Sequence, residues 1–418
     1  MHALIGPVAL LSLLLMLLRP RRIAEVWWVG GGAALLLLTG AIPWHLAAAA
    51  VTDGSDVYLF LVGMMLLAEL AREQGVFDWL AGETVHHARG STPRLLLLVY
   101  GAGVLVTVFL SNDATAVVLT PAILAATRRA RVTPLPHLLA CALVANAASF
   151  VLPISNPANL VVFHHAMPPL HLWLAEFAWP SILTIVVTLL LLQLLFRKTL
   201  AEPVQDAPER VRLQHGGLAA LAGIGLTVVV LLVASARGAA LGMPTCLAAI
   251  GISAAIYGWQ RANPLPLLAG ISWSTLALVA ALFVMVRALE QIGALGWTSM
   301  ALHWAAGRSN TAAVLLTAFT VGVGNNLVNN LPLGLLTSAA LHAAHVTGML
   351  ASAALLGIDI GPNLSVTGSL ATILWLIALR RENVHISAWD FLRAGALIMP
   401  LSLLAACAGL LMQQGLAH

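Results

Sequence analysis

The sequence predicts an all-α polytopic membrane protein with two inverted-topology repeats, each of five transmembrane helices plus a re-entrant hairpin, and with broken helices at the midplane. Three observations lead to this fold class. Of the 418 residues, 60% are hydrophobic and only 9% are charged, and the polar interruptions of the apolar runs recur in both halves of the chain. A typical soluble domain carries about 25% charged residues. So few charges could not cover a water-facing surface of this size, which excludes soluble enzymes.

The positive net charge does not indicate a nucleic-acid partner. The formal net charge is +4 and the pI is near 9.4, but the basic residues flank the apolar runs and mark topology. The three cysteines lie in apolar runs without CxxC spacing, and most of the 14 histidines fall in expected loops. We therefore expect no disulfide framework, no metal site and no cofactor.

Eight uninterrupted apolar runs are long enough to span a bilayer, which takes about 20 residues, with a range of about 17–25. The first run is followed by arginines and by no small-residue cleavage site, so we interpret it as a retained helix rather than a signal peptide. The runs cover residues 2–18, 23–41, 55–71, 172–196, 216–235, 240–259, 272–290 and 390–413.

Two further apolar stretches are interrupted by polar residues. Residues 95–110 and 114–126 meet at Ser111-Asn112-Asp113, and each arm is short for a span. Residues 137–153 and 157–163 meet at the segment from Ile154 to Asn159. Both junctions are too short and too closely flanked by apolar sequence to be water-exposed loops. They predict breaks in helices at membrane depth.

The bias of Lys and Arg toward cytoplasmic flanks sets the topology. Arginines 19, 21 and 22 place the first connection inside, and the 42–54 loop, which lacks Lys and Arg, lies outside. Arg94 and Arg128 lie on the same side of the 95–126 unit, which is therefore a re-entrant hairpin, whereas the 137–163 segment crosses. This arrangement puts 17 of the 20 basic residues in the cytoplasm, the exceptions being Arg237, Arg287 and Arg308.

The same pattern recurs after a polar linker over 197–215, which carries Arg197, Lys198, Arg210 and Arg212. Asn112-Asp113 has a counterpart in Asn325-Asn326, an offset of 213, and the same offset relates Asn156 to Ser369. We expect a first repeat over 1–196, with hairpin 95–126 and broken helix 137–163. The second repeat covers 216–418, with hairpin 310–343 and broken helix 347–380. Five crossings are an odd number, so the second copy is inverted, as in secondary transporters with a substrate site near the midplane.

Unwound backbone at membrane depth is tolerated where it lines a cavity or is buried in protein, so the breaks are expected to converge on one polar cavity. As caps of helix ends, the same side chains would need no ligand, and that alternative remains open. The expected substrate-binding residues are Ser111, Asn112, Thr115, Ser155, Asn156, Asn159, Asn325, Asn326, Asn329, Thr367, Gly368 and Ser369.

Three acidic residues fall in membrane segments, where a carboxylate is costly and is a functional candidate by default. Asp113 lies at a hairpin tip where a helix starts, and we expect it to carry the coupling proton; its alternative role is to cap the 114–126 helix. Asp359, just before Gly361, could simply pair locally. Glu69 lies near the cytoplasmic end of its helix and could be a surface group.

These motifs resemble the arsenite permeases of the ion transporter superfamily over residues 55–413. The resemblance implies efflux of trivalent arsenic and antimony hydroxides, driven by the proton gradient or assisted by a cytoplasmic arsenite-stimulated ATPase. Ser155 to Asn159 also resembles carboxylate and sulfate symporters of the same superfamily. The matching runs are 111–116 with 119–121, 144–149 with 154–159, 324–326 with 329–332, and 357–363 with 368–372.

The chemistry of the breaks favours a neutral ligand. Arsenous acid carries three hydroxyls that can each donate and accept, which suits Asn, Ser and Thr side chains. A divalent anion would be repelled by an ionised Asp113, and no Lys or Arg lies near the breaks. We therefore expect a transporter of the inner (cytoplasmic) membrane that exports arsenite and antimonite in exchange for protons.

The alternatives are a sodium-coupled dicarboxylate or sulfate symporter and a sodium/proton antiporter. An intramembrane aspartyl protease using Asp113 and Asp359 is a different class. An inverted repeat has no evident use in hydrolysis, and no HExxH motif is present. We expect no enzymatic activity.

Overall fold

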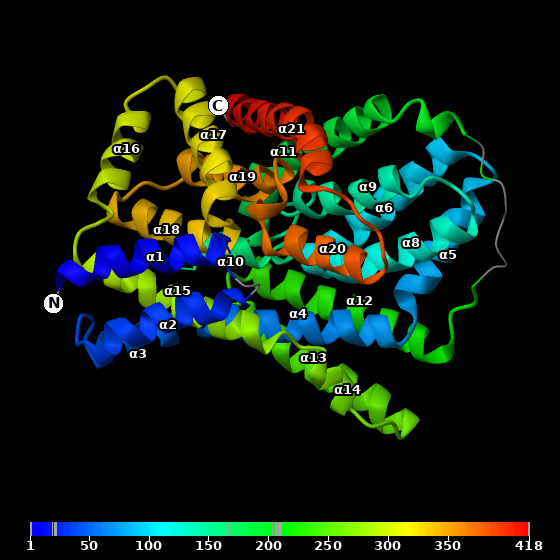
Figure 1. Cartoon of the computed structure of the whole chain (residues 1–418), viewed down its shortest axis with the longest axis horizontal. Coiled ribbons are helices and arrows are strands. Elements are labelled where there is room, and N and C mark those ends of the chain that lie inside the picture. Colours follow the sequence, from blue (N-terminus) through cyan, green and yellow to red (C-terminus); the bar gives the residue numbers. More distant parts are fainter. Residues whose placement is uncertain are drawn as a thin grey trace.

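In the computed structural model all regular secondary structure of the described residues, which are 2–18, 20, 23–164, 167–202, 204 and 211–416, is helical. Figure 1 shows the helices gathered into one bundle in which α5, α6 and α8 lie at one end and α16, α17 and α18 at the other. Several residues used above to orient the chain or to weigh a metal site lie outside the described residues: Arg19, Arg21, Arg22, His165 and Arg210.

The first half of the chain runs from α1 to α11. α1 and α2 have 14 residues each; α1 starts at Ile5, after a 3₁₀ turn over His2–Leu4, and ends with the expected run 2–18, whereas α2 is shorter than the run 23–41 at both ends. Gly40, with φ 68°, turns the chain after α2, and the expected loop 42–54 contains helix α3. The elements are α1 (Ile5–Leu18), α2 (Glu25–Leu38), α3 (Trp44–Asp53), α4 (Ser55–Glu73), α5 (Val76–Ala88), α6 (Thr92–Phe109), α7 (Asn112–Ala114), the π-helical turn η3 (Thr115–Leu119), α8 (Thr120–Arg129), α9 (Leu135–Ala147), the 3₁₀ turn η4 (Pro153–Ser155), α10 (Pro157–Val162) and α11 (Leu170–Leu195).

The second half follows the 3₁₀ turn η5 (Thr199–Ala201) in the linker and has the same order of elements. In each half two helices come first. A short helix, a long helix and one further helix follow them, and then come the hairpin, the broken helix and a final long helix. The elements are α12 (His215–Ala236), α13 (Gly242–Gln260), α14 (Leu265–Ala269), α15 (Trp273–Gln291), α16 (Gly296–Ala306), α17 (Asn310–Val328), α18 (Asn330–Ala343), α19 (Met349–Ile360), the 3₁₀ turns η6 (Gly361–Asn363) and η7 (Val366–Gly368), α20 (Leu370–Arg381) and α21 (Ala388–Leu416).

The lengths of the apolar helices confirm a polytopic membrane fold. Within the described residues, seven helices are long and apolar enough to cross a membrane, and the bent pair α3–α4, with an angle of 45°, makes an eighth. The long helices α11, α12, α13, α15 and α21 coincide with five of the expected runs. α4 coincides with a sixth, 55–71.

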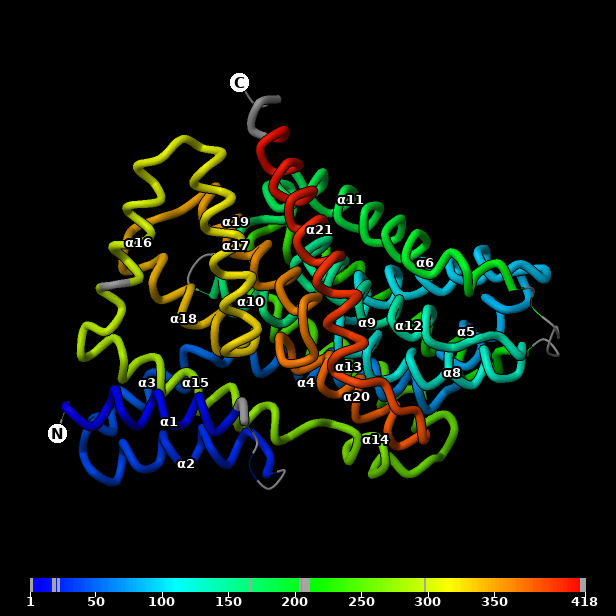
Figure 2. The backbone as a smooth tube through the Cα atoms, turned by 45° about the horizontal axis from the view of Figure 1, so that its top comes forward, coloured from blue at the N-terminus to red at the C-terminus, as the bar shows by residue number. Residues whose placement is uncertain are grey.

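Packing partners are exchanged between the two halves, as a two-fold relation requires. α4 packs against α13, and α2 packs against α15. α8 and η3 contact α20, while α18 contacts α10. α11 and α21 pack against each other, and Gly409 lets α21 approach the backbone of α11 at Pro180, because a Cβ there would lie 2.6 Å from the Pro180 nitrogen. Figure 2 shows these two helices crossing over the rest of the bundle.

Both hairpins turn at a break in the helix. The first hairpin, α6 to α8, breaks at Leu110-Ser111, and the second, α17 to α18, breaks at Asn329, whose φ is 81°. The structural counterpart of Asn112, the first residue of α7, is thus Asn330, the first residue of α18, an offset of 218. Asn325 and Asn326 lie inside α17 rather than at the tip.

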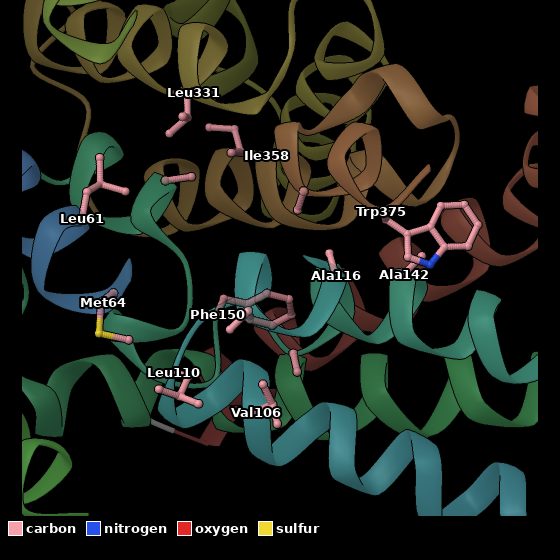
Figure 3. Close-up of a cluster of buried hydrophobic side chains, with 14 of the residues drawn as sticks. Leu61, Met64, Val106, Leu110, Ala116, Ala142, Phe150, Leu331, Ile358 and Trp375 are labelled. Atoms are coloured by element: carbon pink, nitrogen blue, oxygen red, sulfur yellow. The ribbon is translucent and has the colours of Figure 1, made fainter. Parts of the chain in front are cut away.

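Apolar side chains enclose the breaks. Figure 3 shows a cluster to which Leu61 of α4, Leu110 of the first hairpin, Phe150 and Ile358 of the broken helices, and Leu331 of α18 all contribute. A polar group in such surroundings needs a hydrogen-bond partner to offset its loss of water. The polar residues of the breaks are therefore held in an apolar matrix, where their contacts with one another decide the geometry.

Candidate functional site

The tip of the first hairpin is built on serine and threonine contacts. Ser111 Oγ accepts from the Ala114 backbone N–H at 3.2 Å and caps the helix that starts at Asn112. The hydroxyls of Thr115 and Thr107 lie 2.8 Å apart and join the two arms. Asn112 is buried, and its Oδ1 has no hydrogen-bond partner among the described residues. The cap is provided by Ser111, which leaves Asp113 available for another role.

Asp113 lines a cavity of about 120 Å³ between the first hairpin, the two broken helices and α4. Pro157 and Leu370, the first residues of α10 and α20, contribute to its wall. Its polar side chains are acids and hydroxyls, and none of the described Lys or Arg residues lines it. They are Glu69, Ser111, Asp113, Ser272 and Thr275.

The first broken helix is held by its own polar residues. Ser155 Oγ accepts from the Leu152 N–H at 3.1 Å and donates to the Val108 carbonyl of the first hairpin at 3.2 Å. Asn159 Nδ2 donates to the Ser149 carbonyl at 2.9 Å. These two fully buried side chains satisfy the unwound backbone, as the capping alternative expects.

Asn156 connects the two halves. Its Oδ1 accepts from the Ala158 N–H at 3.0 Å and caps α10, and its Nδ2 donates to Asp359 Oδ1 at 2.6 Å. Asp359, at the end of α19, is 1% exposed, and its second oxygen has no partner among the described residues. The local pairing considered for Asp359 is therefore a contact between repeats. A second such contact joins Asn146 Nδ2 to Asn363 Oδ1 at 2.9 Å.

The asparagines of α17 hold the second broken helix. Asn325 Nδ2 donates to the Ile358 carbonyl at 2.5 Å. Asn326 Nδ2 donates to the Gly361 carbonyl at 3.0 Å, and Asn326 Oδ1 accepts from the Ser365 hydroxyl at 2.7 Å. Two side chains that sequence reasoning placed at a hairpin tip thus link α17 to the last turn of α19 and to the unwound segment after it.

A second cavity, of about 210 Å³, lies beside the tip of the second hairpin. Asn329 and Thr367 line it, and Asn329 Nδ2 contacts the Thr367 carbonyl at 3.5 Å. Thr367 Oγ1 also donates to the Asn326 carbonyl at 3.0 Å. Ser369 caps α20 by accepting from the Thr372 N–H at 3.1 Å.

Four of the expected residues therefore line one of these two cavities, and the others line neither. Ser111 and Asp113 line the first cavity, and Asn329 and Thr367 line the second. The others line neither cavity and contact the backbone or side chains of the breaks: Asn112, Thr115, Ser155, Asn156, Asn159, Asn325, Asn326, Gly368 and Ser369. One convergent cavity lined by all of them is not what the structure has.

Two acidic residues in the cavity walls were not predicted as such from the sequence: Glu69 was considered as a surface group, and Glu25 was not singled out. Glu69 lines the Asp113 cavity and forms an ion pair with Arg72, so it is more than a surface group. Glu25, in the first turn of α2, is 8% exposed and lines the second cavity. It is the one charged residue in the 23–41 run, which is the signal that could have singled it out.

Metal ligands do not gather in the part of the chain that the structure describes, where no group of three His, Cys, Asp or Glu side chains is placed to hold an ion. Cys141, Cys246 and Cys407 are free and buried.

The fold and sequence are similar to those of known transporters. The chain is 25% identical over 417 residues to an arsenical pump membrane protein of Escherichia coli, with 96% of each chain covered. It is 26% identical over 426 residues to the protein of the same name from strain K12, again with 96% covered. An uncharacterized transporter of Mycobacterium tuberculosis is 25% identical over 363 residues, which is 83% of each chain.

The solved structure of the Alcanivorax borkumensis YdaH transporter has a similar fold, with a TM-score of 0.57, 16% identity and coverage of 89% of this chain and 88% of that one. The resemblance to arsenite permeases drawn from the motifs is confirmed by the relatives, and the all-α membrane architecture by the fold match. The sequence model of the citrate transporter family matches residues 9–359. Because that match covers most of the chain, the protein belongs to the citrate transporter family and is a multi-pass transporter of the inner membrane.

Proposed function

We propose that the protein exports arsenite and antimonite, as neutral trivalent hydroxides, in exchange for protons. The observation that carries the proposal is the composition of the Asp113 cavity. Among the described residues its polar wall consists of carboxylates and hydroxyls without a basic side chain. Hydroxyl groups can donate to and accept from a neutral hydroxide, whereas an ionised Asp113 repels an anion and the charge of Glu69 is balanced by Arg72.

The size of the cavity agrees with a small ligand. Its volume of about 120 Å³ lies well below the roughly 300–1,000 Å³ of pockets that hold drug-sized molecules. Arsenous acid has four non-hydrogen atoms, and citrate has thirteen. The similarity to arsenical pump membrane proteins over 96% of the chain supports the same substrate class.

Asp113 is the proposed proton carrier. In the exchange, Asp113 is protonated from the outside, releases the proton to the cytoplasm, and then favours binding of the neutral hydroxide at the hydroxyl-lined wall. The substrate moves outward when the hairpins and broken helices shift against the other helices. A carboxyl group at membrane depth is costly, about 2.5–3.5 kcal/mol at a helix centre on insertion scales, and is kept there for function.

A second candidate is favoured by one observation. The start of α20 at Leu370 lies in the cavity wall, and a helix N-terminus attracts anions. Together with the citrate transporter family match, this makes a sodium-coupled dicarboxylate or sulfate symporter the runner-up. A sodium/proton antiporter would use the same hydroxyl and amide oxygens as cation ligands.

Flux into everted membrane vesicles distinguishes these functions. Arsenite, antimonite, citrate and sulfate are offered in turn under an imposed pH gradient, acid inside, and under a sodium gradient. The proposal expects uptake of arsenite and antimonite that depends on pH and not on sodium. Sodium-driven uptake of citrate or sulfate would contradict the proposal and identify a sodium-coupled symporter instead. Vesicles without ATP and without added cytoplasmic proteins show whether an arsenite-stimulated ATPase is needed.

A further inference from the structure

A third cavity adjoins the cavities at the two hairpin tips. It has a volume of about 420 Å³ and lies between α2, α15 and α20. It shares Ser272, Thr275 and Leu370 with the Asp113 cavity. It shares Glu25 and Ile373 with the Asn329 cavity. The three cavities therefore form a row beside α20, from the tip of the second hairpin to Asp113, and we call this row the passage.

Glu25 occupies the junction of this passage. Its side chain lines both the middle cavity and the Asn329 cavity, and it lies in the first turn of α2 with 8% of its surface exposed. The hydroxyls of Ser272, Ser274 and Thr275, on α15 and the residue before it, also line the middle cavity. Ser272 Oγ lies 2.8 Å from Thr275 Oγ1, so the wall that the middle cavity shares with the Asp113 cavity carries paired hydroxyls.

Among the described residues that line the middle cavity, Arg380 of α20 is the one charged side chain besides Glu25. α1, which packs against α2, has no titratable residue, and the charged residues of α15, Arg287 and Glu290, lie near its other end. The sequence also puts arginines 19, 21 and 22 just before α2, outside the described residues. Arg380 is among the expected cytoplasmic markers of the topology, which puts the end of the passage beside it toward the cytoplasm.

We propose that Glu25 is a second proton-binding group of the transporter, which receives the proton from Asp113 and passes it to the cytoplasm. The inference rests on the proposed proton exchange. The Asp113 carboxyl gives its proton to water in the passage, the Glu25 carboxylate accepts it, and Glu25 then releases it to bulk water. Only O–H bonds break and form, and both carboxyl groups return to their starting state after one cycle.

The test compares Glu25→Gln, which keeps shape and hydrogen bonding, with Glu25→Asp, which keeps the acid. Two fluxes are measured in everted vesicles: arsenite uptake driven by a pH gradient, and counterflow of labelled against unlabelled arsenite, which needs no net proton release. A positioned proton-transfer group contributes about 10²–10⁴-fold to a rate, so E25Q should slow gradient-driven uptake at least about tenfold. Counterflow should stay within about twofold of wild type because substrate binding is untouched. E25D should recover most of the driven uptake.

Asp56→Asn is the matched control, because Asp56 is also a first-turn acid at a helix interface, accepting from the Gly242 N–H at 2.7 Å, and lines none of the three cavities. If E25Q does not fold, Ser274→Ala decides: it removes a hydroxyl that lines the middle cavity and not the Asp113 cavity, and it should slow driven uptake alone. Driven uptake by E25Q or S274A equal to wild type, or equal loss of both fluxes, overturns the inference. Failure of the proposed function looks different, since wild type itself would then show no driven arsenite uptake.

Discussion

The side-chain amide of Asn156 donates a hydrogen bond of 2.6 Å to the carboxylate of Asp359, and the two residues belong to opposite halves of the chain. Asn156 caps α10, whose first residue, Pro157, lines the Asp113 cavity. Asp359 ends α19 with one oxygen unpartnered among the described residues. The contact therefore fixes the second broken helix relative to the wall of the cavity.

Asn156→Ala should destabilise the protein. The substitution leaves the buried Asp359 carboxyl without a partner, at about 1–3 kcal/mol, and removes the cap of α10, at about 0.5–2 kcal/mol. Asn263→Ala is the control, because exposed Asn263 makes only a local cap, accepting from the Leu265 N–H at 3.0 Å. The midpoint of thermal unfolding in detergent should fall further for N156A. Equal shifts would show that the contact with Asp359 contributes nothing.

Gly368→Ala should impair the second unwound segment. A Cβ at this position would lie 2.5 Å from Pro362 Cα and 2.8 Å from Asn326 Oδ1, the atom that accepts from Ser365. Such overpacking typically costs about 1–3 kcal/mol. Gly225→Ala, on α12, is the control because nothing lies within 4 Å of its added methyl group. The midpoint of thermal unfolding and the arsenite flux should both fall for G368A and stay unchanged for G225A. A decrease for G225A and none for G368A would contradict the packing described.

The regular parts of the fold follow from the sequence. Long apolar runs such as 172–196 and 216–235 became α11 and α12 almost residue for residue, because an unbroken apolar stretch has only one stable form in a bilayer. The breaks at Ser111 and Asn156 were also predicted, since Ser and Asn with a following helix start are local capping signals. These features depend on neighbours in the chain alone.

The parts that depend on tertiary contacts were not predictable. Asn325 and Asn326 look like a helix break in sequence, yet they lie inside α17, and their side-chain amides donate to the Ile358 and Gly361 carbonyls. The turn falls instead at Asn329, where the backbone is left-handed. Glu25 enters the passage only because α2 packs on α15 beside α20. No local pattern carries that information.

The hydroxyl pair of the first hairpin should contribute measurably to stability. Thr107→Val removes one partner of the 2.8 Å contact with Thr115, and both side chains are fully buried. The expected loss is about 1 kcal/mol, because the Thr115 hydroxyl still approaches the Ser111 carbonyl at 3.4 Å. Thr52→Val, at an exposed hydroxyl of α3, should leave the unfolding midpoint unchanged. A thermal unfolding midpoint of T107V equal to that of wild type would show that the Thr107–Thr115 contact does not stabilise the hairpin.

The passage beside Asp113 should be open to the cytoplasm. Ser272→Cys should react with a membrane-impermeant thiol reagent added to everted vesicles, whose outer surface is the cytoplasmic face. Thr52→Cys, on the α3 segment expected outside, should react only in right-side-out vesicles. The native cysteines give a low background because all three are buried. Labelling of S272C from the opposite face alone would contradict the orientation of the passage.

The central claim is that Asp113 couples proton movement to export of a neutral hydroxide. It is tested most directly by arsenite uptake into everted vesicles with an acid interior, comparing wild type with Asp113→Asn at matched protein levels. Wild type should accumulate arsenite and dissipate the pH gradient as it does so, and D113N should do neither. D113N should still fold, with an unfolding midpoint within a few degrees of wild type, which corresponds to a change in stability of about 1 kcal/mol. Gradient-driven accumulation by D113N equal to that of wild type would contradict the account.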